Sequence, residues 1–255
     1  MKRHLLITST LIFRFATALA LAGCGQSEAP KLLAKNDPAP APAVAPAAAP
    51  SQPAGSGVVY SARSGSKMRI EGTSNIHDWQ VESPFIGGMM EVGPGFPIEP
   101  GQAATPGKMD AKADVFIQVR SLKSIEKDGR PYSDMMDKIT WEHLKEEQYK
   151  RITYHLTELT LKETPKTKDA PYVFDAKGDL AVAGVTNNIA MVVNILPQAD
   201  KKLEITGTIS FKMTQFKVEP PAPKIALGLI KTGDEVKLIF KWIVGQRKAA
   251  APANP

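Results

Sequence analysis

Strict alternation of apolar and polar residues constrains the fold of this chain more than any other feature of its sequence. The alternation is clearest from Leu203 to Met213, where every second residue is apolar or glycine and Glu, Thr, Ser or Lys stands between. Successive side chains of a strand point to opposite faces, so this pattern predicts a half-buried strand. The same pattern recurs in residues 115–119, 152–156, 189–195 and 236–242.

One segment departs from this pattern. Residues 131–149 place apolar side chains at helical spacing, and Ser133 or Asp134 could cap a helix there. Many short strands with one helical interruption indicate an all-β fold, either a closed antiparallel barrel or a sandwich. Closure would remove exposed strand edges, and eight strands enclose just enough space for one small ligand. The alternation alone leaves barrel and sandwich open.

The N-terminus has the order of a bacterial lipoprotein signal. The basic residues Lys2 and Arg3 precede an apolar stretch, which ends in the tetrapeptide Leu21-Ala22-Gly23-Cys24. This tetrapeptide resembles a lipobox, in which the cysteine is acylated and the chain is cut before it. We therefore expect residues 1–23 to be a signal peptide and Cys24 to be a lipid anchor. Arg14 departs from the pattern, and the alternative is an ordinary signal peptide with a chance cysteine.

The remaining chain divides by composition. Residues 24–57 are rich in Ala and Pro and are expected to form an extended linker. Residues 58–245 have the size of one domain, and residues 246–255 are expected to be a disordered tail. Without the three basic residues of the signal, 29 basic and 26 acidic residues leave a net charge of +3. So small a charge does not predict binding to nucleic acid.

Three segments together resemble the YceI-like family, which are lipocalin-like polyisoprenoid-binding proteins. The first is Gly72-Thr73-Ser74-Asn75-Ile76-His77-Asp78-Trp79, and the second is Ser121-Leu122-Lys123-Ser124 with the helical segment after it. The third is the C-terminal half, with Ala183-Gly184-Val185-Thr186 and Thr232-Gly233-Asp234. Their order and spacing extend over nearly all of residues 58–245. The Pro/Gly-rich residues 93–107 depart from the family and predict a longer loop.

The resemblance implies an eight-stranded antiparallel β-barrel with a long apolar interior. It also implies export, and a ligand that is a polyisoprenoid, the tail of an isoprenoid quinone or another long lipid. Such a chain offers no hydrogen-bonding groups, so its site needs an apolar tunnel. The helical segment is expected at the mouth, as a cover that moves when the ligand enters. The candidate ligand-binding residues are Phe85, Ile117, Met135, Met136, Tyr154, Met191, Ile209, Phe211, Leu238 and Phe240.

The sequence predicts neither an enzyme nor a metal site. His77 and Asp78 are adjacent, and adjacent strand residues point to opposite faces, so His77 is expected to be hydrogen-bonded within the barrel wall. His143 is expected on the helical segment, and His155 is expected to face outward. These scattered histidines lack the spacing of metal ligands, and Cys24 is the only cysteine. No cofactor is expected apart from a bound polyisoprenoid lipid or quinone.

The predicted function is that of an exported, membrane-anchored lipoprotein whose barrel binds or carries a long apolar lipid. The alternative is a structural or regulatory envelope protein that uses the barrel as a platform for other proteins. Gly25 follows the cysteine, in place of the aspartate that favours retention at the inner membrane. In a Gram-negative cell we therefore expect the protein on the periplasmic side of the outer membrane. The oligomeric state is not predicted.

Overall fold

A computed structural model describes residues 57–222 and 230–247 of the chain. The predicted signal peptide, the anchor Cys24 and all but the last residue of the predicted linker lie outside these residues. So does the predicted tail after residue 247. No helix in the described part of the chain has the length and apolar character to cross a membrane.

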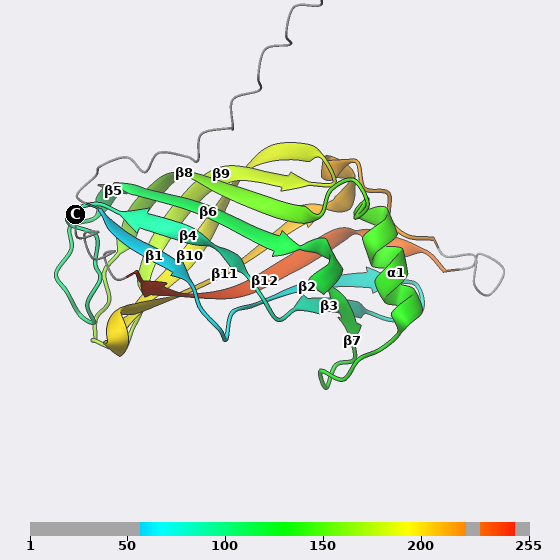
Figure 1. Cartoon of the computed structure of the whole chain (residues 1–255), viewed down its shortest axis with the longest axis horizontal. Coiled ribbons are helices and arrows are strands. Elements are labelled where there is room, and N and C mark those ends of the chain that lie inside the picture. The colour runs from blue at the N-terminus through cyan, green and yellow to red at the C-terminus, as the bar shows by residue number, and fades with distance from the viewer. Residues whose placement is uncertain (1–56, 223–229, 248–255) are drawn as a thin grey trace, which may run out of the picture. The chain divides into compact units, whose positions relative to one another are not determined.

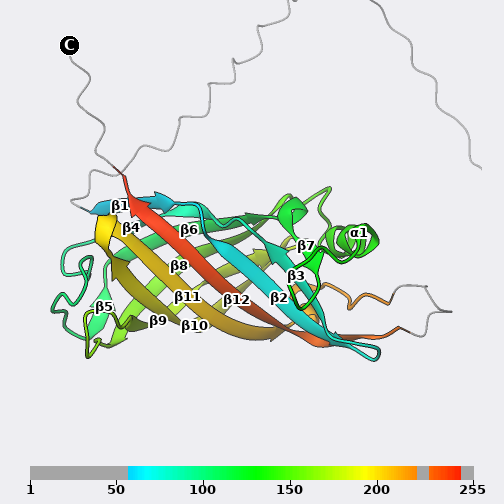
Figure 2. The same ribbon diagram turned by 90° about the horizontal axis from the view of Figure 1, so that it is seen from below.

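Eight strands close into an antiparallel barrel (Figure 1, Figure 2). In ring order they are β1 (Val58–Ala62), β4 (Gly87–Val92), β6 (Ala111–Gln118), β8 (Arg151–Glu163), β9 (Tyr172–Val182), β10 (Val185–Gln198), β11 (Lys202–Lys212) and β12 (Thr232–Gln246). The ring closes where β12 pairs with β1, with Gln246 opposite Tyr60. The predicted eight-stranded barrel is therefore confirmed, and the sandwich is excluded.

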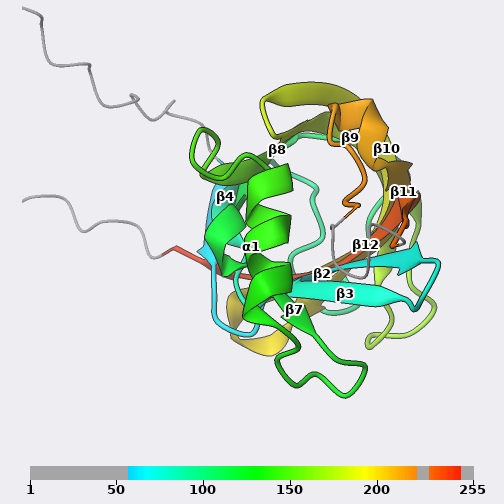
Figure 3. The same cartoon turned by 90° about the vertical axis from the view of Figure 1, so that its right-hand side faces the viewer.

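At one end the wall divides. The first part of β12 pairs with β2 (Lys67–Ser74), β2 pairs with β3 (Trp79–Ser83), and β3 pairs with β7 (Lys123–Ile125). These three strands extend the sheet from β12 and are not part of the ring of eight, and the helix α1 (Asp134–His143) lies across part of this end (Figure 3). The short β5 (Gly107–Met109) adds to β8, and three 3-10 turns complete the fold: η1 (Val119–Ser121), η2 (Ala199–Lys201) and η3 (Met213–Phe216).

The helix is shorter than the predicted segment 131–149. Ser133 is its N-cap residue but makes no side-chain capping bond, and the helix ends before Lys145, which has a left-handed φ of 53°. A left-handed residue at this point is a common way to terminate a helix.

The end of the barrel opposite α1 is filled, and we call it the closed end. Tyr172, Phe174 and Leu203 are completely buried there. Phe96, from the predicted Pro/Gly-rich loop, stacks on Phe174 with ring centroids 5.6 Å apart, and the Tyr172 hydroxyl donates a hydrogen bond to the carbonyl of Gln102 in the same loop. The loop therefore acts as a plug for this end of the barrel.

The C-terminal boundary differs slightly from the prediction. Gln246 belongs to β12, although the tail was expected to begin there, and the N–H of Arg247 donates to the carbonyl of Val59 at 2.8 Å. Backbone pairing with β1 thus extends the barrel to the last described residue.

Candidate functional site

A cavity of about 700 Å³ occupies the α1 end of the barrel. We call it the outer cavity. Its walls are apolar side chains from the inner faces of the strands, among them Ile152, Leu180, Val182, Phe211 and Leu238. They come from positions of the period-two pattern, so the alternation that builds the wall also makes the cavity apolar.

The rim of the outer cavity carries apolar side chains in contact with solvent. Ile76 from the β2–β3 connection, Tyr132 from the loop before α1 and Met135 from α1 are 59%, 45% and 51% exposed. Charged residues of the same rim include Lys127, Asp128 and Arg130. The mouth therefore combines exposed apolar side chains with charged ones.

A second, smaller space of about 120 Å³ lies deeper in the barrel. We call it the inner chamber. It shares Ile152, Leu180 and Leu238 with the outer cavity, so the two spaces adjoin at these side chains. Its other walls are formed mainly by aliphatic, methionine and aromatic side chains. Together the two spaces form an apolar interior open at the α1 end.

Nine of the ten predicted ligand-binding residues line these two spaces. Their positions agree with the prediction, and their role in ligand binding stays a prediction. The inner chamber is lined by Ile117, Tyr154, Met191, Ile209 and Phe240. The outer cavity is lined by Met135, Met136 and Phe211, and Leu238 lines both spaces.

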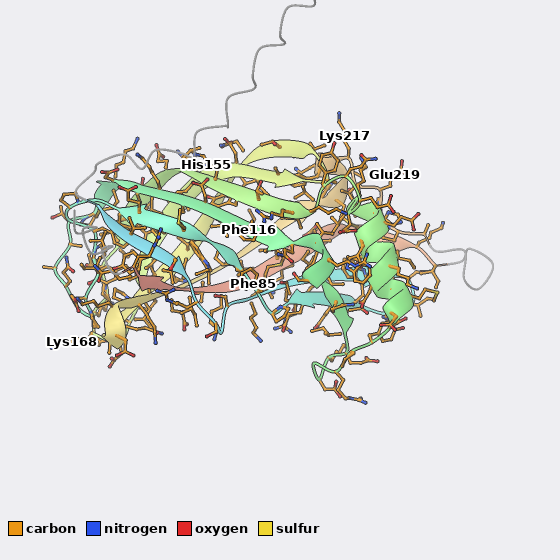
Figure 4. The ribbon with its side chains drawn as sticks, viewed as in Figure 1. Phe85, Phe116, His155, Lys168, Lys217 and Glu219 are labelled. Atoms are coloured by element: carbon orange, nitrogen blue, oxygen red, sulfur yellow. The ribbon has the colours of Figure 1, made fainter. Side chains whose placement is uncertain are left out.

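Phe85 is the exception. It was expected on the inward face of a strand, but it lies in the connection between β3 and β4, is 43% exposed and lines neither space. The Ser83 hydroxyl donates to the carbonyl of Phe85 at 2.8 Å and accepts its N–H, which fixes a turn. The Phe85 ring then lies edge-on to Phe116, with centroids 6.1 Å apart (Figure 4).

The helix α1 is fastened to the barrel by two buried side chains. The Asp137 carboxylate accepts hydrogen bonds from the N–H and the hydroxyl of Ser124, at 2.6 and 2.8 Å, and lies 3.0 Å from the Lys123 ammonium. One turn later, the Trp141 indole donates to the carbonyl of Leu122 at 2.9 Å. Movement of the helix as a cover, which the sequence suggested, would have to break these bonds.

The protonation of Asp137 reflects this environment. Burial raises the pKa of its carboxyl group, but the hydrogen bonds from Ser124 and the charge of Lys123 outweigh burial. The pKa of Asp137 is therefore lower than usual, and the carboxylate is charged at neutral pH.

Comparison with known proteins identifies the family. Residues 62–243 match the YceI-like domain, which is most of the predicted domain and more than half of the chain. The chain belongs to the YceI-like family. This confirms the family predicted from the three sequence segments.

Solved structures share the fold at low sequence identity. A polyisoprenoid-binding domain from Saccharophagus degradans, implicated in plant cell wall breakdown, is 13% identical with a TM-score of 0.51, covering 74% of this chain and 99% of its own. BcnA from Burkholderia cenocepacia is 12% identical with a TM-score of 0.50, covering 70% of this chain and 94% of its own. No curated protein matches the sequence. At this identity the two structures show a common fold alone.

Two polar groups in the interior of this YceI-like barrel have no hydrogen-bond partner among the residues that the structure describes. Among the described residues, no group accepts a hydrogen bond from the Tyr154 hydroxyl or the Trp242 indole N–H, and both atoms are buried. Burial, with a contribution from the charge of Asp179, raises the pKa of Tyr154 to about 12. A buried, unpaired polar group typically costs about 1–3 kcal/mol. The sequence prediction included Tyr154 but missed Trp242, which stands two residues from Phe240 on the same inward face.

His77 lies at the mouth and not in the barrel wall, which corrects the sequence prediction. The Ser74 hydroxyl accepts the N–H of His77 at 3.1 Å and donates to its carbonyl at 2.7 Å, so β2 ends at Ser74 and His77 falls in a turn. Its ring is edge-on to Tyr132, with centroids 6.0 Å apart. The Ser74-Asn75 pair was a turn signal that could have revealed this break.

The other described histidines have separate partners. His143 Nδ1 lies 2.9 Å from the carbonyl oxygen of Glu219, and His155 Nδ1 lies 2.7 Å from Asp114 Oδ1 on the outer face, as expected for His155. The described residues contain no cluster of His, Cys, Asp or Glu able to hold a metal ion.

Proposed function

We propose that this YceI-like protein binds and carries a long apolar lipid, a polyisoprenoid or an isoprenoid quinone, inside its barrel. The observation that carries the proposal is the outer cavity of about 700 Å³, which is walled by apolar side chains and continues toward the inner chamber. Ligand cavities usually have volumes of roughly 300–1,000 Å³. The polyisoprenoid-binding domain from Saccharophagus degradans, which has the same fold, supports the proposal.

The energetics favour a long hydrocarbon. Burial of about 400 Å² of a prenyl chain at roughly 25 cal/mol per Å² gives on the order of 10 kcal/mol before the costs of association and ordering. Methionine is unbranched and adapts to ligands of different shape, so Met135, Met136 and Met191 suit a site that takes a flexible chain. Among the described residues of the mouth, the rings of His77 and His143 contact the carbonyl oxygens of Asp78 and Glu219 and no serine or threonine hydroxyl. We therefore propose binding, not catalysis, as the role of this site.

The proposal is tested by the lipid that accompanies the purified protein. The full chain is purified from its own cells, extracted with organic solvent and analysed by mass spectrometry. We expect lipids whose masses differ by whole isoprene units, at up to one molecule per chain. A protein that carries no lipid, takes up no added prenyl lipid and instead binds an envelope protein would favour the alternative, a protein-interaction platform.

We propose further that the protein is exported and anchored through Cys24, on the periplasmic side of the outer membrane in a Gram-negative cell. The support is the Leu21-Ala22-Gly23-Cys24 sequence, with Gly25 after it. Cys24→Ser should abolish lipid modification and release the protein from membrane fractions. Gly25→Asp is the matched variant, which should keep the lipid but move the protein toward the inner membrane. Unchanged fractionation of Cys24→Ser would contradict the anchor.

A further inference from the structure

Three cationic side chains on the outer wall beside α1 lie over aromatic rings. The Arg120 guanidinium carbon is 4.1 Å, and the Lys123 ammonium nitrogen 4.4 Å, from the centre of the Trp141 ring. The Arg151 guanidinium carbon is 4.3 Å from the centre of the Phe116 ring. Within the described residues these are all of the cation–π contacts. An aromatic face that holds a long side chain in place reduces the entropy which that side chain loses when it binds an anion.

Neighbouring segments join these cations into one surface with Phe85. Gln118 on β6 stands opposite Arg151 on β8, and the Ser121 hydroxyl donates to the carbonyl of Gln118 at 2.6 Å. The Ser121 hydroxyl oxygen is 2.7 Å from that of Ser83, the residue that fixes the turn of Phe85. Figure 4 shows the labelled phenylalanines close together on this wall. We call this surface the cationic patch, and its members are Phe85, Phe116, Arg120, Lys123 and Arg151.

The acids that pair with these cations are buried beneath them. The Arg120 side chain is 65% exposed, whereas that of its partner Glu146, 3.6 Å away, is 14% exposed. The Lys123 side chain is 50% exposed, whereas that of its partner Asp137, 3.0 Å away, is 6% exposed. Solvent therefore meets the positive member of each pair, and the negative member lies below the surface.

Arg151 and Phe85 complete the exposed part of the patch. Arg151 is exposed and has no acidic partner within the described residues. Asp114, an exposed acid two residues before Phe116 on β6, has a partner of its own, since its Oδ1 lies 2.7 Å from His155 Nδ1. Phe85 is 43% exposed. The patch thus presents fixed positive charge beside an aromatic ring that is in contact with water.

We infer that the cationic patch docks on the surface of an anionic lipid bilayer, where its cations contact lipid phosphates and the Phe85 ring enters the boundary between headgroups and acyl chains. Arginine binds phosphate strongly, and an aromatic ring is stable at this boundary. A small soluble anion would neutralise the cations but leave Phe85 in water, so a membrane surface fits both features. Because Trp141 belongs to α1, docking brings the α1 end of the barrel close to the bilayer. The inference does not require a lipid inside the barrel.

Binding to vesicles of two compositions tests this inference. The full chain carrying Cys24→Ser, which removes the proposed lipid anchor, is sedimented with phosphatidylcholine vesicles that contain or lack anionic phosphatidylglycerol. We expect tighter binding to the anionic vesicles and a loss of this preference at high salt. Arg151→Gln should weaken binding to the anionic vesicles roughly fivefold, since this is the value of one cation near such a surface. Addition of Arg120→Gln should bring a further loss of similar size.

Matched variants separate the patch from net charge and from general apolarity. Lys168→Gln removes the same charge from an exposed loop at the closed end and should leave vesicle binding unchanged (Figure 4). Phe85→Ala should weaken binding about fivefold, the value of burying roughly half of such a side chain, without changing the dependence on salt. Val192→Ala, at an exposed apolar residue of β10, should have no effect. Thermal unfolding confirms that each variant is folded.

The outcomes decide between membrane docking and its alternatives. Equal binding to both kinds of vesicle, or equal losses in Lys168→Gln and Arg151→Gln, would overturn the cationic patch. Binding to heparin that depends on Arg120 and Arg151, without binding to anionic vesicles, would overturn membrane docking and assign the patch to a soluble polyanion. Neither result concerns the lipid extracted from the barrel, so the proposed function is tested separately.

Discussion

At the closed end of the barrel the interior is solid with aromatic and aliphatic side chains, whereas at the α1 end the same kind of strand surrounds a cavity of about 700 Å³. Individual strands extend through both regions: β9 begins with the buried Tyr172 and Phe174 at the closed end and reaches the outer cavity with Leu180 and Val182. An inward apolar face is therefore common to both ends, and it does not decide whether the space inside is filled.

The two ends of the barrel differ in the segments that close them. The loop over residues 93–106 inserts Phe96 against Phe174, while at the other end β2, β3 and β7 extend the sheet from β12 and α1 lies over part of the opening. The described chain also enters and leaves the barrel at the closed end, where Tyr60 pairs with Gln246 (Figure 2). The mouth therefore lies at the opposite end of the barrel from Gly57 and Arg247, and the dense core lies at the closed end.

The largest effect is expected where the core is dense. Phe174→Ala removes a completely buried ring and should lower the free energy of unfolding by about 3–5 kcal/mol. The matched variant Phe211→Ala lies on the outer cavity and should cost at least about 1 kcal/mol less, since its neighbours already adjoin open space. Urea denaturation gives both values. Equal losses would show that the two ends are packed alike.

The attachment of α1 should have the next largest effect. Asp137→Ala removes two hydrogen bonds and a charge partner, and should cost about 2–3 kcal/mol, whereas the exposed Asp134→Ala should change stability by less than about 0.5 kcal/mol. Hydrogen exchange of the α1 amides should accelerate in Asp137→Ala alone. If α1 exchanges no faster in that variant, the bonds to Ser124 do not hold the helix.

The same carboxylate predicts a dependence on pH. The folded state lowers the pKa of Asp137, so the attachment of α1 is fully present above the unfolded value of about 3.9 and is lost as the pH falls through the lower folded value. Exchange of α1 amides, corrected for the intrinsic rates, should therefore rise at acid pH before the closed end opens. If amides of α1 and of the closed end begin to exchange at the same pH, Asp137 does not hold the helix locally.

A tunnel-filling substitution should have a moderate effect on stability and a specific effect on lipid. Leu238→Phe enlarges a side chain shared by both internal spaces and should cost roughly 1–3 kcal/mol while reducing the amount or length of copurified lipid. Ile239→Phe, the next residue on the opposite face of β12, is the matched control and should leave the lipid unchanged. A folded Leu238→Phe protein that keeps its lipid at full occupancy would place the ligand outside the barrel.

The smallest effect is expected on the outer wall. Phe85→Ala removes an exposed ring that lines neither internal space, so it should change stability by about 0.5 kcal/mol or less and leave lipid content unaltered. Thermal unfolding and lipid extraction measure the two quantities. A loss of lipid in this variant would contradict the structure, because it would show that Phe85 contacts the ligand although it lines neither internal space.

The residues that the sequence predicted well are those fixed by the period of two. Phe211, Leu238 and Phe240 stand on long alternating strands, and their inward direction follows from position alone. The predictions for Phe85 and His77 were wrong because Ser83 and Ser74, respectively, end the preceding strand through a local hydrogen bond. The alternation of apolar and polar residues does not reveal such a bond.

Other features depend on contacts between distant segments. Phe96 comes from a loop without periodicity, and its stacking on Phe174 could not be predicted from either residue alone. The same holds for Asp137, whose acceptor role requires Ser124 on β7 at the right distance. The family resemblance supplied the barrel and its apolar interior, but the solid end, the open end and the two unpaired donors follow from the packing of the structure.

Photochemical mapping of a bound ligand tests the central claim most directly, which is that a lipid occupies the α1 end and not the closed end. A geranylgeranyl probe with a diazirine on its chain is bound to the full-length protein and irradiated, and the labelled residues are identified by mass spectrometry. The account predicts labels on outer-cavity residues such as Met136, Phe211 and Leu238, with excess unlabelled lipid preventing them. Labels confined to Phe85, Val192 or other outer-wall residues, or labels that unlabelled lipid fails to prevent, would contradict it.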